Sequence, residues 1–255
     1  MKISKFLVLS TVTITFFVGC QHFRMEVYPD LRMESIPGSY SGPCRDSLEN
    51  LLADIWATGF FNNNQFSREE ILNNRYGIFN TGSSVSRVTS GRACFIKEKE
   101  GSDMVMLNRR LFSHLQRDDT GRVGVKMKDR NLSATLVHEL FHDFWHNTID
   151  RQKRALFATE MEILYKDIIM AKSEEEKIQF LKKIGYRNPK ENDFRPFSEL
   201  QCVKKNYTNE KFFGTELFSI IADRTFSRKI IIPKQLRIFY SGIIADEILE
   251  RSSPQ

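Results

Sequence analysis

The pattern of apolar and polar residues differs between the two halves of the chain. In the first half, residues 44–61 repeat apolar side chains at helical spacing and predict an amphipathic helix. Residues 92–97 and 103–108 are short β-prone runs separated by Gly101 and Ser102, which predicts a β-hairpin or a small twisted sheet. The first half therefore mixes helix and strand.

Helical periodicity governs the second half of the chain. It predicts helices over about 133–147, 151–172, 173–184 and 215–227, and a last helix beginning near Pro233. The expected fold class is thus α+β, with a small twisted sheet followed by a mostly helical body. The run at 103–108 is also the candidate edge strand for binding an extended peptide by strand addition.

The N-terminal residues carry the pattern of an export signal. Two lysines precede an uncharged apolar run over 6–18, which is short for a membrane span. The run ends at Cys20 in the letters FVGC, which resembles a bacterial lipobox. The resemblance implies cleavage before Cys20 and lipidation of that cysteine, and Gln21 after it implies sorting to the outer membrane, facing the periplasm. A signal peptide cleaved elsewhere and a retained membrane anchor are the alternatives.

The expected organisation is a lipoprotein signal peptide over 1–19, a lipidated tether rich in Pro and Gly over 20–43, and one domain over 44–255. Three cysteines remain in that domain, and an exported chain can keep a disulfide. They allow three alternative pairings, among which the sequence does not choose: Cys44, Cys94 and Cys202.

The distribution of basic residues bears on whether the protein binds nucleic acid. The formal net charge is +6, but the basic residues are spread along the chain and form no run interleaved with aromatic residues. Nucleic-acid binding is therefore not expected. The oligomeric state cannot be predicted from these features.

Three of the five histidines fall within the helix predicted over 133–147. His138 and His142 are four positions apart, so their imidazoles share one helical face and can reach one ion. Most other positions of this helix are apolar, which predicts burial nearly all round. Buried imidazole nitrogens need partners, and a shared metal ion supplies one.

Glu139 completes an H-E-x-x-H pattern over 138–142. In this pattern the glutamate takes a proton from a water molecule that zinc has acidified, while the two histidines hold the metal. The pattern is short enough to occur by chance, and the alternative is a pair of core histidines satisfied by hydrogen bonds. Its position inside a predicted helix favours the metal site.

The order of elements resembles the gluzincin group of zinc metallopeptidases, in which a glutamate on a later helix is the third metal ligand. Residues 215–223 resemble that helix, and the resemblance assigns the ligand position to Glu216. Many members carry an acidic residue four positions later, where this chain has Ile220. Asp223 lies two turns along the same face, so the residue that orients His138 stays open at this point.

Several residues compete for or complete the expected site. Glu160, Glu162 and His146 are alternative third ligands. Tyr240 is a candidate donor to the oxyanion that develops during amide hydrolysis, with packing inside a helix as the alternative.

The sequence thus predicts a lipid-anchored, zinc-dependent peptidase with one Zn²⁺ per chain and a peptide or protein as its substrate. A zinc-binding envelope protein without turnover is one alternative, and a structural lipoprotein without metal is the other.

Overall fold

The computed structural model describes residues 43–65, 76–79, 93–96, 104–108, 115–117, 123–125, 130–206 and 210–251. The predicted signal peptide and nearly all of the tether, including Cys20, lie outside these residues. None of the helices in the described ranges is long and apolar enough to cross a bilayer. Side-chain positions of Cys44, Cys94 and Cys202 are also outside the description, so the disulfide question is not tested.

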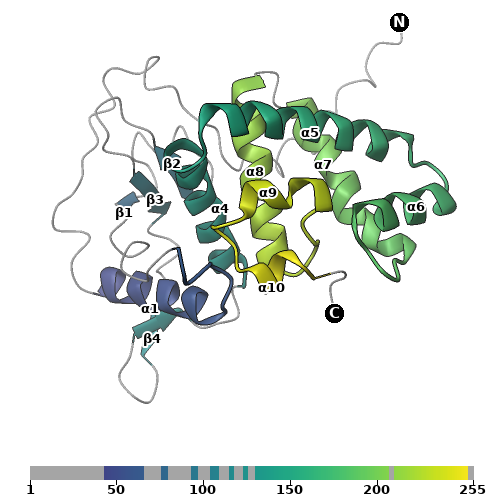
Figure 1. The fold of residues 1–255 in the computed structure, drawn as a ribbon. Coiled ribbons are helices and arrows are strands. Elements are labelled where there is room, and N and C mark those ends of the chain that lie inside the picture. Colours follow the sequence, from purple (N-terminus) through teal and green to yellow (C-terminus); the bar gives the residue numbers. More distant parts are fainter. Residues whose placement is uncertain are drawn as a thin grey trace, which may run out of the picture.

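Helices form most of the described chain (Figure 1). The longer ones are α1 (Pro43–Ala57), α4 (Arg130–Asn147), α5 (Arg151–Met170), α6 (Glu174–Ile184), α7 (Arg195–Asn206) and α8 (Glu210–Phe226). Short turns of helix connect or follow them: η3 (Glu191–Phe194), η4 (Lys234–Leu236), α9 (Arg237–Tyr240) and α10 (Asp246–Leu249).

The described strands are three to five residues long and form two small sheets. Their bounds are β1 (Tyr76–Phe79), β2 (Ala93–Ile96), β3 (Met104–Asn108), β4 (Leu115–Arg117) and β5 (Val123–Val125). β3 is the central strand of the first sheet, parallel to β1 and antiparallel to β2. β4 and β5 form a separate antiparallel pair.

These findings correct two predictions. The α+β class was wrong, because the described chain is mostly helical. The edge-strand prediction for 103–108 was also wrong, since β3 uses both of its edges to pair with neighbouring strands. Short β-prone runs identify strands but not how much of the core they build.

Several helix boundaries also differ from the predicted ones. α4 begins at Arg130, three residues before the predicted start near 133. Between the helices predicted over 173–184 and 215–227, the structure adds η3 and α7, with Pro196 in the first turn of α7, where a missing backbone N–H costs nothing. The helix expected from Pro233 is only η4 and α9, which end before Gly242 at a φ of 85°.

The core is centred on α4 and α8, which pack against each other along much of their length (Figure 1). A Cβ atom added at Gly214 of α8 would lie 3.0 Å from the ring of Trp145 on α4, so glycine allows the two helices to come this close. One turn further along α8, Phe218 stacks on Tyr240 of α9 with ring centroids 4.5 Å apart. Phe218 also lies against Trp145 and Phe141 of α4, with ring centroids 5.3 and 5.5 Å apart, so burial of this one ring packs α8 against both α4 and α9.

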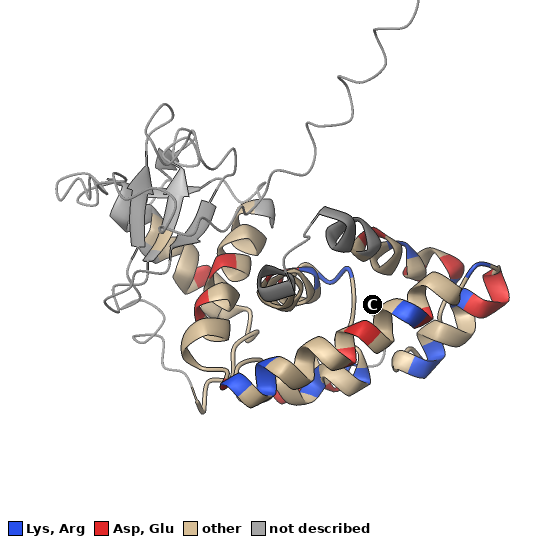
Figure 2. Ribbon diagram, turned by 90° about the horizontal axis from the view of Figure 1, so that it is seen from above, with Lys and Arg blue, Asp and Glu red and all other residues tan. Residues whose placement is uncertain are grey.

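Helices α5 and α6 carry acidic and basic residues interspersed along their length (Figure 2). α6 has three glutamates in its first turn and two lysines in its last, which complements the helix dipole. Ser173 and Glu176 form a capping box at its start, and Gly185 ends it in the left-handed region. These two helices therefore carry many solvent-exposed charges, whereas the buried polar residues of the described chain lie on α4 and α8.

Candidate metal centre

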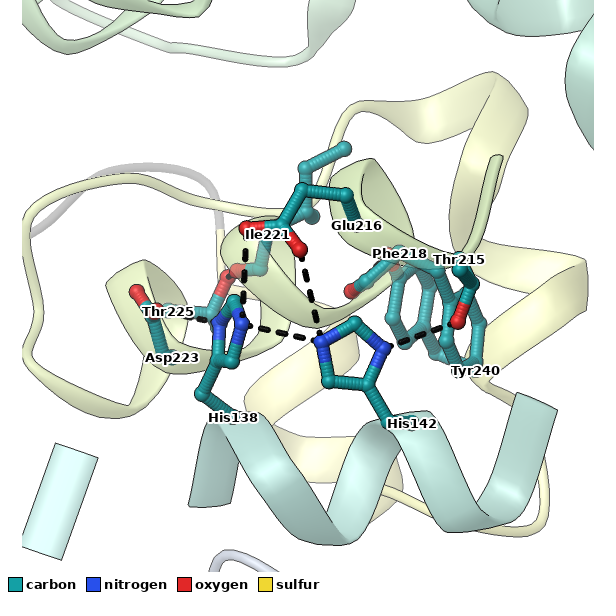
Figure 3. Close-up of polar contacts among 9 residues, drawn as sticks. All are labelled: His138, His142, Thr215, Glu216, Phe218, Ile221, Asp223, Thr225 and Tyr240. Atoms are coloured by element: carbon teal, nitrogen blue, oxygen red, sulfur yellow. Dashed lines mark hydrogen bonds and ion pairs between the residues drawn. The ribbon is translucent and has the colours of Figure 1, made fainter. Parts of the chain in front are cut away.

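Three side chains predicted as ligands come together between α4 and α8 (Figure 3). Each of His138, His142 and Glu216 offers one ligand atom, and these atoms all lie within 4.8 Å of one another. The two Nε2 atoms are 3.1 Å apart, and each lies 3.5 Å from an oxygen of the Glu216 carboxylate. This group could hold a metal ion, and it is the one such group among the residues described.

The local sequence explains why these atoms converge. His138 and His142 are one turn apart on α4, and the residues around them are buried: Leu136, Val137, Leu140 and Phe141 are each 0% exposed. The prediction that this helix is buried nearly all round is therefore confirmed. On α8, Glu216 lies just after Gly214, the residue at which a side chain would press on Trp145 of α4. A buried carboxylate is thereby brought directly over the two imidazoles.

The outer nitrogen of each imidazole has its own partner (Figure 3). Nδ1 of His138 donates to Oδ2 of Asp223 at 3.0 Å, because a carboxylate can only accept. Nδ1 of His142 lies 2.8 Å from Oγ1 of Thr215. With both Nδ1 atoms as donors, both Nε2 atoms of the neutral rings carry lone pairs that face each other. Such a pair needs a proton or a cation between its members.

Burial and charge shift the proton affinities of all three groups. Burial raises the pKa of Glu216 to about 7, although His138 opposes the change. Burial lowers the pKa of His138, but the carboxylates of Glu216 and Asp223 outweigh it and raise that pKa to about 9. Burial and the neighbouring His138 hold the pKa of His142 well below its usual value. At neutral pH without metal, protons therefore bind where a cation would bind.

The donor set fits a divalent metal. The site holds two imidazole nitrogens and one carboxylate, with both histidines oriented from behind, as is usual around a ligated metal. Oε2 of Glu216 is buried and makes no hydrogen bond within the described part of the chain. A buried carboxylate oxygen in that state is costly unless a cation or a proton satisfies it.

Glu139 is 1% exposed on α4, and its charge contributes to the raised pKa of His138. The carboxylate therefore lies near the metal group and is not one of its three ligand residues. This is the position that the H-E-x-x-H pattern predicts for a proton-accepting group.

Tyr240 is not directed at the metal group. It is 0% exposed, and its hydroxyl donates to the backbone oxygen of Phe218 at 2.9 Å. Burial and the nearby charge of Asp223 hold the pKa of this hydroxyl well above its usual value. The predicted role as oxyanion donor is not supported, because the hydroxyl proton is already used inside the core.

The alternative third ligands are not part of the group. Glu162 is exposed on α5, Glu160 is half-buried there, and neither contributes a ligand atom. His146 is half-buried on α4 and acts on the pKa of His142 through its charge, but it too lies outside the group.

Sequence reasoning missed Thr215 and left the role of Asp223 open. The position of Thr215 next to the predicted ligand Glu216 was the available signal. A β-branched hydroxyl residue in an otherwise apolar helix requires a hydrogen-bond partner when it is buried, and Thr215 is 0% exposed.

Comparison with known proteins does not identify a relative. No protein-family model matches the chain, and no curated protein and no solved structure is significantly similar to it.

Proposed function

We propose that this protein is a zinc-dependent peptidase of the bacterial cell envelope. The observation that carries the proposal is the convergence of His138, His142 and Glu216 on one point, with Glu139 buried beside them. A purely structural zinc site has four protein ligands, whereas a catalytic site has three and keeps one position for water or substrate. Three protein ligands and an adjacent carboxylate match the second arrangement.

Zinc suits this donor set, since zinc accepts two imidazoles and one carboxylate in tetrahedral geometry and keeps a fourth position for water or substrate. When bound, zinc would polarise the scissile carbonyl and lower the pKa of the attacking water towards about 7. With the metal bound, Glu139 would accept a proton from the attacking water and would return it to the departing amine. Asp223 and Thr215 hold the two imidazoles so that their Nε2 atoms stay directed at one point.

The place of action and the substrate are parts of the same proposal. Lipidation at Cys20 would tether the domain to the outer membrane, and the substrate would be a peptide or protein within reach of that anchor. The support for this part is the sequence pattern of residues 1–21.

Zinc content per chain is the measurement that tests the metal site. We expect about one zinc per wild-type chain purified without chelator. His142→Ala and Glu216→Ala should lose it, while Glu162→Ala, which removes an exposed glutamate outside the group, should keep it. No zinc in the wild-type protein would overturn the proposal.

Hydrolysis is tested separately with Glu139→Gln. This variant should bind zinc like the wild type and should lose cleavage of a peptide library by roughly a hundredfold or more. Full zinc content together with no cleavage that depends on Glu139 would favour the alternative, a zinc-binding envelope protein that does not turn over a substrate.

A further inference from the structure

A cavity in the molecule is lined by none of the metal-group residues. It is a cavity of about 320 Å³ bordered by α1, the first turns of α4, the end of α8 and α10. Its apolar wall consists of Ile55, Phe60, Phe226 and Ile248. At roughly 30 Å³ per water molecule, the cavity has room for about ten waters or one small organic ligand.

Charged side chains stand at the opening of this cavity. Arg228 and Arg251 are both exposed, and neither forms an ion pair within the described residues. Asp54 also lines the cavity, so its charged residues sum to one net positive charge. Two hydroxyls at the cavity are already used, because Thr58 donates to the backbone oxygen of Ile55 and Thr225 to that of Ile221. The two guanidinium groups are therefore the strongest unused donors.

The backbone at Arg228 gives a second, independent observation. α8 ends in a Schellman motif: the N–H of Lys229 bonds to the oxygen of Arg224 at 2.8 Å, and the N–H of Arg228 bonds to that of Thr225 at 3.0 Å. Arg228 occupies the left-handed position of this motif, with a φ of 57°. Glycine is the usual residue there, since a side chain makes the conformation less favourable. The helix end thus does not explain the arginine, which also borders the cavity.

We propose that this cavity binds a small monocarboxylate with an apolar body. The carboxylate is received by the guanidinium groups of Arg228 and Arg251, which match its geometry better than an ammonium would. The apolar body lies against Phe60, Phe226 and the aliphatic residues of the wall. Asp54 disfavours a second negative charge in the ligand, which is why the ligand is a monocarboxylate.

Two sources supply this chemistry: a short aliphatic acid, or the free carboxyl end of an apolar amino acid in peptide linkage. Hexanoate and N-acetylphenylalanine represent them, and their amides are the matched neutral probes. Isothermal titration of the full-length protein with these four compounds tests the proposal. At least one carboxylate should bind about tenfold tighter than its amide, the size expected for a charge-assisted contact. Which carboxylate binds identifies the source.

Variants separate ligand binding from folding. Arg228→Gly and Arg251→Gln should each weaken binding of the carboxylate by about tenfold or more. Lys229→Gln, a neighbouring cation that does not line the cavity, should bind normally. Arg228→Gly should also raise the melting temperature, by about 2 to 4 °C, because it relieves the left-handed arginine.

Zinc content should be the same in all these variants, so this test does not depend on the metal site. Equal affinity for a carboxylate and its amide would overturn the proposal. So would the absence of binding by all four probes at about 10 mM, which is roughly the weakest dissociation constant that such a titration detects. So would unchanged binding in Arg251→Gln, whose exposed position leaves the fold intact.

Discussion

The carboxylate of Asp223 accepts a hydrogen bond from Nδ1 of His138 at 3.0 Å, although the two residues are 85 positions apart in the chain. Asp223 is two turns beyond Glu216 on the same face of α8. One helix therefore supplies both a candidate ligand and the group that orients a second ligand. A carboxylate behind an imidazole also increases the basicity of the nitrogen that faces the metal.

Replacing Asp223 should weaken metal binding without abolishing it. We expect Asp223→Ala to raise the dissociation constant for zinc by about 10- to 100-fold, the usual effect of losing such a partner. Asp223→Asn keeps a hydrogen-bond acceptor but loses the charge, so its effect should be smaller. Competition with a chromogenic chelator measures both constants. Identical constants for wild type and Asp223→Ala would contradict the orienting role.

Thr215 should matter through its hydroxyl rather than its shape. Thr215→Val has nearly the same volume but leaves Nδ1 of the buried His142 without its 2.8 Å partner. We expect a loss of stability of about 1 to 3 kcal/mol and weaker zinc binding. Thr215→Ser keeps the hydroxyl and is the matched control. Chemical denaturation with and without zinc distinguishes them, and equal behaviour of the two variants would show that the hydroxyl has no role.

Zinc binding should become tighter as pH rises. In the metal-free protein the pKa of His138 is raised to about 9 and that of Glu216 to about 7. Zinc must displace the proton of His138 below about pH 9, and below about pH 7 that of Glu216 as well. The logarithm of the association constant should therefore rise by about one per pH unit between 7 and 9, and more steeply below 7.

The same shifts predict how zinc changes stability. Stabilisation from protonated His138 is complete below its unfolded value of 6.5 and is lost as pH rises through about 9. For Glu216 the contribution is present below 4.5 and is lost as pH rises through about 7. The metal-free protein should thus lose stability from Glu216 between about pH 4.5 and 7 and from His138 between about pH 6.5 and 9. The zinc-induced rise in melting temperature should grow over the same range. A pH-independent rise, measured by scanning calorimetry, would argue against proton displacement at this site.

The parts of the site that the sequence predicts are those determined by local geometry. His138 and His142 share a face because they are four positions apart on a helix, and no tertiary information is needed for that. Glu216 is assigned through the resemblance of residues 215–223 to a ligand-bearing helix, and its place in an otherwise apolar stretch leaves it either solvated or committed to a partner. The apolar character of α4 likewise predicts its burial, which the structure confirms.

The parts of the site that the sequence did not predict depend on which segments meet in space. The pairing of Asp223 with His138, and of Thr215 with His142, requires the approach of α8 to α4 that Gly214 allows. The balance between sheet and helix failed for a related reason. A short β-prone run such as that containing Val105 has the same pattern whether its sheet builds the core or only borders a helical one.

The predicted role of Tyr240 as an oxyanion donor can be tested by mutation. Its hydroxyl donates to the oxygen of Phe218, and its ring stacks on the Phe218 ring at 4.5 Å. Tyr240→Phe keeps the stacking and removes one buried hydrogen bond, so we expect a loss of about 1 kcal/mol and a melting temperature lower by about 2 to 4 °C.

Turnover separates this structural role from a catalytic one. If Tyr240 only packs, the Phe variant should hydrolyse peptides with the same kcat as the wild type at a temperature where both are folded. A donor to the developing oxyanion is worth about 10²- to 10³-fold in kcat, far more than the loss of packing explains. A decrease of that size in a folded, zinc-loaded Tyr240→Phe protein would require the hydroxyl to leave Phe218 during the reaction. The core around α8 would then have to open during each catalytic cycle.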